Sequence, residues 1–441
     1  MIVLEEHFEV TVGQNLKRIR KDLGLRQHQI AGEDITRNLI SLIENDKATL
    51  YDTAANIMAR NINKIMSEKN LNIFIKPEDL LNPKRYNARK KADTYIERLE
   101  DDLINKKFDI KSNELNEIEA FLNEWDLTDK KVKIYELLGD IFYASNNSNK
   151  EYYYYFKALE SSYDFPNMKG RYKIALKLVF NCIVTGKCDE AINLCKYMLL
   201  SQNDIPDMYK GVFYYNSALA YKKLKEYDNC LNNLDIAKKY IDDTSDNFKK
   251  ILMLEGISYY ETKNYNKALV SYEKFLEILG ETNRFDEICA TYINIVQIHI
   301  KRNDKESILK YFDKIMTTLP YIDDDSFYLT EIYYEISNVF LYLNNYEESE
   351  KYLNTALASS KKFGMHNLYK KFLGKLMELY INTNSLDKLS DLLKTIDDEI
   401  INIRFKEDFI LVLKLLLYFI KQNNYKEAEN LIIDLLQKKE V

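Results

Sequence analysis

The sequence predicts an all-α protein in which a small helix-turn-helix domain is followed by a superhelix of helical hairpins. The 441 residues include only 11 Gly and 5 Pro, and so few helix breakers favour helices over β-rich folds. Apolar residues recur with helical spacing along most of the chain. Short polar corners return at nearly constant intervals from residue 106 onward, which indicates stacked repeats.

The N-terminal sequence predicts a short leader without regular structure and then a compact domain of about five helices, which we call the head. We assign this domain to residues 1–69. An apolar stripe indicates a helix over 12–23, and a second amphipathic helix is expected over 51–66. The prolines of the segment NLNIFIKPEDLLNP stop helices and close the head. We treat residues 70–84 as the linker to the remainder.

Between those helices, QHQIAGEDITRNLISLIEN (27–45) has the layout of a helix-turn-helix. A short helix is followed by a tight polar turn and a second helix that starts at Thr36. Ile40 and Ile43 fall on the buried side of this second helix. The residues that face outward are Arg37, Asn38 and Ser41. A helix with such side chains fits the major groove of DNA.

Nine polar corners divide the rest of the chain, 85–441, into about nine hairpins. Successive corners start 38 to 42 residues apart, and apolar helical stretches flank each of them. They begin at residues 106, 146, 186, 225, 263, 302, 344, 384 and 423. Such regular spacing predicts helical hairpins that stack on their neighbours and curl into a superhelix with a concave face.

The local pattern of these hairpins resembles tetratricopeptide repeats. Pairs of small residues stand twelve positions apart around the corners, as in Gly256/Ala268 and Ser337/Ser349. Small residues at these positions let two helices approach closely. The period of about 40 residues departs from the usual 34, so longer helices or longer loops are expected.

Charge and cysteine usage narrow the class of protein. Residues 1–100 carry 17 Lys+Arg against 15 Asp+Glu, whereas the remainder carries 46 against 54. A mildly basic head on an acidic body fits a protein whose head contacts DNA. The five cysteines form no CxxC pair and no signal peptide is recognisable, so we expect buried, reduced thiols in the cytoplasm. The longest apolar run, near 410–420, is too short to span a bilayer.

The sequence does not support an enzymatic function. It has no Gly-rich phosphate loop and no HExxH motif, and its four histidines are scattered. Paired acids such as Asp323 and Asp325 flank helices, where capping explains them. We therefore expect no catalytic residues, no metal and no cofactor.

The head resembles the helix-turn-helix of phage-repressor-like (XRE-type) regulators. The matching features are Gln27 at the start of the second helix, Ala31, and the S-x-I-E-N ending over 41–45. The turn before Ile40 is one residue shorter than in the commonest members. This short turn resembles the peptide-pheromone-responsive (RRNPP-like) quorum-sensing receptors of Gram-positive bacteria, which join such a head to tetratricopeptide repeats.

The resemblance implies a set of DNA contacts. Arg37, Asn38 and Ser41 correspond to residues that touch base edges, and Arg suits guanine whereas Asn suits adenine. Residues that match phosphate contacts are Gln27, Arg26 and Lys47. Two further cationic clusters, at 17–21 and 84–91, either approach the DNA backbone or are solvated charge. For the second cluster we favour exposed charge.

The resemblance also implies a peptide site on the concave face, which the first helix of each hairpin supplies. An Asn amide both donates and accepts, so it matches the backbone of an extended peptide, and Tyr adds flat apolar area. The candidate residues are Asn216, Tyr215, Asn294, Tyr292, Asn338, Tyr334, Tyr260 and His299. Because Asn and Tyr are abundant everywhere, each of them has a purely structural alternative. The aromatic run at 152–156 is interpreted as inter-repeat core.

These features together predict a cytoplasmic transcription regulator that binds a palindromic DNA operator as a homodimer and senses a short signalling peptide. One small head contacts too little DNA for high specificity, which favours the dimer. An alternative is a scaffold whose repeats bind a partner protein, such as a phosphotransfer component, with a secondary head. A third hypothesis is a phage-type repressor that is controlled by a phage peptide.

Overall fold

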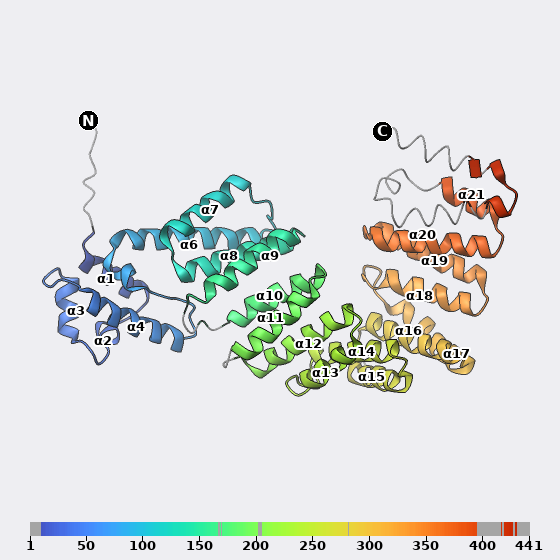
Figure 1. Cartoon of the computed structure of the whole chain (residues 1–441), viewed down its shortest axis with the longest axis horizontal. Coiled ribbons are helices and arrows are strands. Elements are labelled where there is room, and N and C mark those ends of the chain that lie inside the picture. The colour runs from blue at the N-terminus through green and yellow to red at the C-terminus, as the bar shows by residue number, and fades with distance from the viewer. Residues whose placement is uncertain are drawn as a thin grey trace. The chain divides into compact units, whose positions relative to one another are not determined.

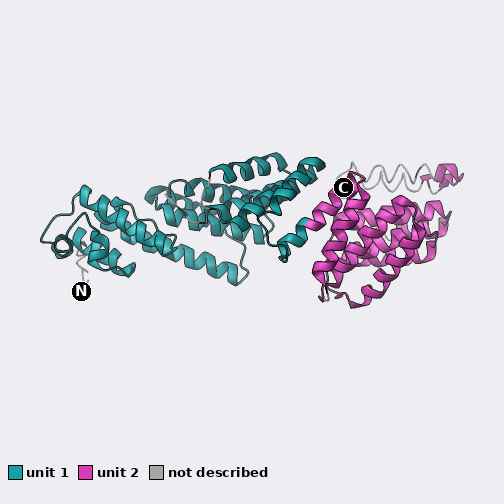
Figure 2. Ribbon diagram, turned by 90° about the horizontal axis from the view of Figure 1, so that it is seen from below, with its two compact units in different colours: residues 1–251 teal, residues 252–441 magenta. Residues whose placement is uncertain are grey.

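The computed structural model describes residues 10–165, 168, 170–201, 205–280, 282–394, 416, 419–426 and 428–429. Throughout these residues the regular secondary structure is helical and no strand occurs, which confirms the predicted all-α class (Figure 1). The chain forms two compact units, residues 1–251 and residues 252–441 (Figure 2). The expected N-terminal leader lies almost wholly outside the described residues.

The head consists of five helices at the start of unit 1. They are α1 (Val12–Asp22), α2 (Gln27–Ala31), α3 (Arg37–Glu44), α4 (Asp52–Glu68) and α5 (Pro77–Leu81). Thr11 caps α1 and Thr36 caps α3, because each hydroxyl accepts a hydrogen bond from a backbone N–H three residues later. Leu16, Ile40 and Met58 are fully buried in the core that these helices share. The helices expected at these places are therefore present.

The segment 70–84 packs as part of the head instead of forming a loose connection. Ile75 is buried in the head core, and the side chain of Asn63 bonds both its N–H and its C=O at 2.8 Å. Asn15 of α1 donates from Nδ2 to the carbonyl oxygens of Asp79 and Leu80 at 2.9 and 3.0 Å. Helix α5 thus completes the core, as expected of a segment that closes the head.

Helical hairpins follow the head. Their first helices are α6 (Pro83–Ile104), α8 (Thr128–Ala144), α10 (Arg171–Val184), α12 (Asp207–Lys223), α14 (Asp246–Glu261), α16 (Phe285–Arg302), α18 (Leu329–Tyr342) and α20 (His366–Asn382). Their second helices are α7 (Ser112–Trp125), α9 (Ser148–Ser162), α11 (Cys188–Ser201), α13 (Tyr227–Ala237), α15 (Tyr265–Leu279), α17 (Lys305–Thr318), α19 (Tyr346–Lys362) and α21 (Leu386–Lys394). A short 3₁₀ helix, η1 (Leu319–Tyr321), follows α17. The ninth predicted hairpin lies mostly outside the described residues.

Each predicted corner contains one residue with a positive φ angle. These residues are Lys106, Asn146, Gly186, Lys225, Lys263, Asn303, Asn344, Asn384 and Asn423. A left-handed residue ends a helix and lets the next backbone N–H bond back to a carbonyl five residues earlier. Asn147 bonds Phe142 in this way at 2.9 Å, and Asn345 bonds Phe340 at 2.9 Å. Asn adopts this conformation more readily than most residues, which explains its frequency at the corners.

Small residues on the first helices make room for side chains of the second helices. A Cβ added at Gly256 would lie 2.4 Å from Cε1 of Tyr272, and Tyr272 is 2% exposed. Gly139 stands in the same relation to the ring of Tyr155, at 2.3 Å. The predicted role of Gly256 in close helix approach is therefore confirmed, and its contact is an aromatic ring.

Replacing Gly256 with alanine is expected to lower the free energy of unfolding by about 1–3 kcal/mol, because the buried ring of Tyr272 has nowhere to move. Urea unfolding followed by circular dichroism measures this change. Glu261→Ala, at an exposed position of the same helix, is the control and should change little. If Tyr272→Leu does not reduce the cost of Gly256→Ala, the predicted clash is not its cause.

Candidate functional site

The start of α3 presents two polar side chains to the surroundings. Arg37 and Asn38 occupy its first turn, both are exposed, and neither has a hydrogen bond or ion pair to any described residue. Ser41, one turn further on, is half-buried. Helix α3 lies at the outer edge of the head in Figure 1. The donors of Arg37 and the amide of Asn38 are thus available to a ligand outside the head.

A buried carboxylate holds α3 against the two preceding helices. Arg20 of α1 donates to both oxygens of Glu44, from Nε at 2.5 Å and from Nη2 at 2.9 Å. Gln27, the first residue of α2, donates from Nε2 to Oε2 of Glu44 at 2.9 Å. The side chain of Glu44 is 2% exposed. The orientation of α3 is therefore fixed by charge-assisted hydrogen bonds as well as by its apolar side.

The predicted phosphate contacts divide into two kinds. Arg26 and Lys47 are exposed and have no ion pair with any described residue. Gln27, in contrast, uses its amide nitrogen on Glu44, and Arg20 of the first cationic cluster does the same. Sequence reasoning missed the structural role of Glu44, although its signal was present as the acid in the S-x-I-E-N ending.

The second cationic cluster supplies a buried charge network between the head and the first hairpins. Arg89 of α6 contacts Asp129 of α8 through Nη1 at 3.0 Å and Nη2 at 2.5 Å, and Asp79 of α5 at 3.4 Å. Arg85 donates from Nε to Asp79 at 2.7 Å. Arg89 is 8% exposed and the two aspartates are 1% and 4% exposed. Our interpretation of this cluster as exposed charge is therefore wrong for Arg85 and Arg89.

Further bonds strengthen this junction. Lys76, just before α5, pairs with Asp126 at 2.8 Å, and the hydrogen bond from Lys76 lowers the pKa of the Asp126 carboxyl below its usual range. Asp22 of α1 accepts from the hydroxyl of Tyr86 at 2.9 Å and pairs with Lys90 at 2.9 Å. The head is thus joined to helices α6 to α8 by contacts from α1, α5 and the segment before α5.

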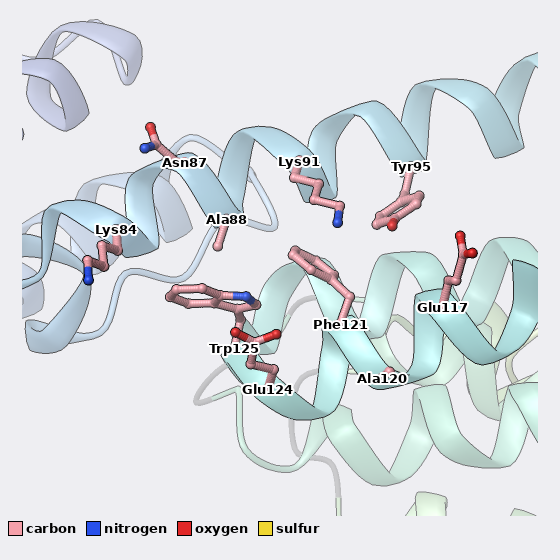
Figure 3. A pocket seen from close by; sticks show the side chains of 10 residues that line it. All are labelled: Lys84, Asn87, Ala88, Lys91, Tyr95, Glu117, Ala120, Phe121, Glu124 and Trp125. Carbon is pink, nitrogen blue, oxygen red and sulfur yellow. The ribbon is translucent and has the colours of Figure 1, made fainter. Parts of the chain in front are cut away.

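A hollow of about 630 Å³ lies beside this junction, between α6 and α7 (Figure 3). Its lining residues are Lys84, Asn87, Ala88, Lys91, Tyr95, Glu117, Ala120, Phe121, Glu124 and Trp125. The rings of Phe121 and Trp125 point from α7 toward α6 in Figure 3. Trp125 is the single tryptophan of the sequence, and its carbonyl oxygen accepts a hydrogen bond from Arg85 at 2.8 Å. Its fluorescence is therefore a natural reporter of the junction.

In unit 2, the successive first helices α16 and α18 carry four polar side chains, Asn294, Gln297, Glu335 and Asn338, which we call the polar stripe. Gln297 and Asn338 both donate to Oε2 of Glu335, at 3.0 and 3.2 Å. Asn294 donates to the sulfur of Met253 at 3.5 Å, a weak acceptor. Sequence reasoning found the two Asn residues and missed Gln297 and Glu335. The signal was their register, since Glu335 lies nine residues before the left-handed Asn344, as Asn294 does before the left-handed Asn303.

The other predicted residues of unit 2 contribute to packing. The rings of Tyr292 and His299 face Tyr311 of α17 with centroids 6.0 and 5.8 Å apart. Tyr260 lies against Tyr265, at 5.9 Å. Tyr334 stacks on Phe372 of the next hairpin at 4.6 Å. His299 is 8% exposed and contacts Asp304 through Nδ1 at 3.1 Å. These four side chains thus bind helices to each other.

In unit 1, Asn216 is placed differently from the amides of the polar stripe. It is 9% exposed and has no hydrogen bond to a described residue. Its neighbour Tyr215 is half-buried, and burial raises the pKa of that hydroxyl. Asn216 lies nine residues before the left-handed Lys225, the same register that Asn294 has before Asn303. The amide of Asn216 is thus an unsatisfied donor and acceptor on a first helix.

The remaining chemical groups are structural. All five cysteines are free and buried, and burial raises the pKa of Cys195 to about 12, so its thiol is inert at neutral pH. Within the described ranges, no group of three His, Cys, Asp or Glu residues is placed to hold a metal ion. No helix in that part of the chain has the length and apolarity needed to cross a bilayer.

Comparison with known proteins identifies the fold. The chain resembles a signal-transduction ATPase with a tetratricopeptide repeat sensor from Pyrococcus horikoshii (13% identity, TM-score 0.51, 98% of this chain and 72% of that chain). It is also similar to aspartyl phosphate phosphatase F from Bacillus subtilis (13%, 0.48, 90% and 95%) and to the apo quorum sensor NprR from B. thuringiensis (14%, 0.47, 79% and 99%). No family model and no curated protein matches the sequence. The Pyrococcus likeness shows a tetratricopeptide-type fold.

Proposed function

We propose that this protein is a DNA-binding transcription regulator whose tetratricopeptide-type repeats bind a short signalling peptide and thereby control operator binding. The observation that carries the proposal is the first turn of α3, where Arg37 and Asn38 are exposed and unpaired among the described residues. Arg matches the two acceptors of guanine, and Asn matches the donor and acceptor of adenine. Glu44 holds α3 against the head through its pair with Arg20, and the first turn of α3 presents Arg37 and Asn38. A helix held and exposed in this way suits the major groove.

The peptide half of the proposal rests on amide groups of the first helices. An extended peptide exposes an unpaired N–H and C=O at every residue, and side-chain amides satisfy both. Asn294 and Asn338 supply such amides in unit 2, and Asn216 supplies one in unit 1. Asn294 and Asn216 have capacity left for a ligand, because Asn294 meets only a sulfur atom and Asn216 has no bond to a described residue.

The proposed control of DNA binding by the peptide depends on the contacts between the head and helices α6 to α8. A peptide changes DNA affinity only if it binds two conformations of the protein unequally. Because the buried Arg89 network ties α5 of the head to α6 and α8, a change in the first hairpins is passed to the head. In a homodimer this resets the spacing of two α3 helices, which must match half-sites about one DNA turn apart.

Arg37→Ala is expected to relax sequence preference at one base pair by about 1–3 kcal/mol, because it removes a base-edge contact. Fluorescence anisotropy of the full chain on DNA from upstream of its own gene, and on single-base variants of that DNA, measures the effect. Arg302→Ala removes an exposed arginine of unit 2 and is the matched control. If affinity for all sequences falls equally, Arg37 is a phosphate contact.

The same experiment separates the regulator from a scaffold that binds a partner protein through its repeats. Phosphate attraction is strongest at low salt, so any DNA-binding head reveals itself there. Absence of binding by the full chain at low salt, with and without its peptide, would reject the regulator and leave the scaffold.

A further inference from the structure

The carboxylate of Glu335 stands out in the polar stripe because its hydrogen-bond partners among the described residues are both neutral. Gln297 and Asn338 donate to the same oxygen, Oε2, and Oε1 receives no hydrogen bond from a described residue. Among the described residues, Glu335 forms no ion pair. The side chain is half-buried, so it has lost part of its hydration. A carboxylate in such a position is normally balanced by a cation.

Neighbouring groups do not supply that balance. The lysine at the equivalent position of the next first helix, Lys375, is engaged with Glu378 of its own helix at 3.4 Å. Lys371 lies over the ring of Tyr334, 4.3 Å from its centroid. Burial raises the pKa of the nearby Tyr260 and Tyr334 hydroxyls, and the charge of Glu335 adds to this shift, so neither hydroxyl supplies a positive charge. The stripe therefore keeps a net negative charge.

We propose that Glu335 is the specificity-determining anchor of the peptide site and binds a positively charged group of the ligand, either its N-terminal ammonium or a Lys or Arg side chain. This inference rests on the proposed peptide-binding function. The two amides on Oε2 hold the carboxylate in one orientation, so Oε1 is directed to the incoming cation. Asn294 and the remaining acceptor of Asn338 bond the peptide backbone beside it.

A selection experiment with the full-length protein tests the inference. The probes are pools of random heptapeptides in which one position is fixed as either lysine or acetyl-lysine, each pool with a free or an acetylated N-terminus. Peptides retained with the protein on size exclusion are quantified by mass spectrometry. Wild type is expected to retain cationic peptides at least roughly tenfold better than their uncharged counterparts, as charge-assisted hydrogen bonds allow. The pools with an acetylated N-terminus and those with acetyl-lysine show whether Glu335 binds the N-terminal ammonium or the lysine side chain of the peptide.

Glu335→Gln keeps the shape of the side chain and removes its charge, so it should abolish the preference for cations while uncharged peptides are still retained. Glu331→Gln, an exposed acid one turn earlier on α18, is the matched control and should keep the preference. Retention without charge preference in wild type, or a preference that persists in Glu335→Gln, overturns the inference and leaves peptide binding intact. Failure of wild type to retain any peptide overturns the proposed peptide function together with it.

Discussion

Replacing Arg89 with methionine is expected to lower the free energy of unfolding of unit 1 by about 3–5 kcal/mol. The substitution leaves Asp129, which is 4% exposed, without its cationic partner, and takes one of two arginines from Asp79. An uncompensated buried carboxylate costs far more than the lost bond itself. Urea unfolding followed by Trp125 fluorescence measures the effect at the junction, where Trp125 accepts from Arg85.

Two further variants isolate the cause. Lys90→Met removes a neighbouring cation whose pair with Asp22 is about half exposed, so its cost should stay below about 1 kcal/mol. Arg89→Met combined with Asp129→Asn removes both charges, and this double variant should recover much of the loss. A cost for Arg89→Met no larger than that for Lys90→Met would show that the network does not hold the junction together.

Glu44→Gln is expected to destabilise the head by about 3 kcal/mol, because Arg20, with a side chain only 13% exposed, then keeps its charge without a counter-charge. Hydrogen exchange of α1 and α3 backbone amides measures this local loss. Operator affinity should fall as well, since Glu44 sets the orientation of α3. Glu33→Gln, at an exposed position of the turn, is the control.

The same carboxylate gives the head a defined pH dependence. Burial raises the pKa of Glu44, but hydrogen bonds from Arg20 and Gln27 and the charge of Arg20 outweigh it, so the pKa lies below its ordinary value. Its stabilising contribution is therefore complete above the ordinary glutamate pKa, near 4.3, and is lost as the pH falls through the lower folded-state value. In wild type, α3 protection should fall across this acid range, and in Glu44→Gln that step should disappear.

The repeats could be predicted from sequence because a few adjacent residues determine each corner. A left-handed residue such as Asn344 followed by a capping Asn345 ends one helix and starts the next using only neighbouring backbone groups. Nothing distant is needed, so even spacing alone located all nine corners. The helices of the head were predictable for the same reason, from Thr36 as a cap and the apolar side of the following helix.

The junction could not be predicted, because its charges find partners far along the chain. Arg89 lies in a run of cations that looks solvated, yet its partner Asp129 is 40 residues away and on another helix. The candidate peptide face was predicted only in part. Tyr292 and Asn294 are two residues apart on α16, so their side chains leave the helix in different directions. Tyr292 faces α17, whereas Asn294 faces the first helix α14. Helical spacing gives these directions only after the hairpin packing is known.

The most direct test of the account measures operator affinity of the full-length protein before and after its peptide is bound. Peptides that co-purify with the protein from its own cells, identified by mass spectrometry and synthesised, are the probes, and anisotropy on DNA upstream of its gene is the readout. The account predicts a change in affinity of about tenfold or more, within the usual range of coupling energies. An operator affinity that stays the same while calorimetry shows the peptide bound would contradict it.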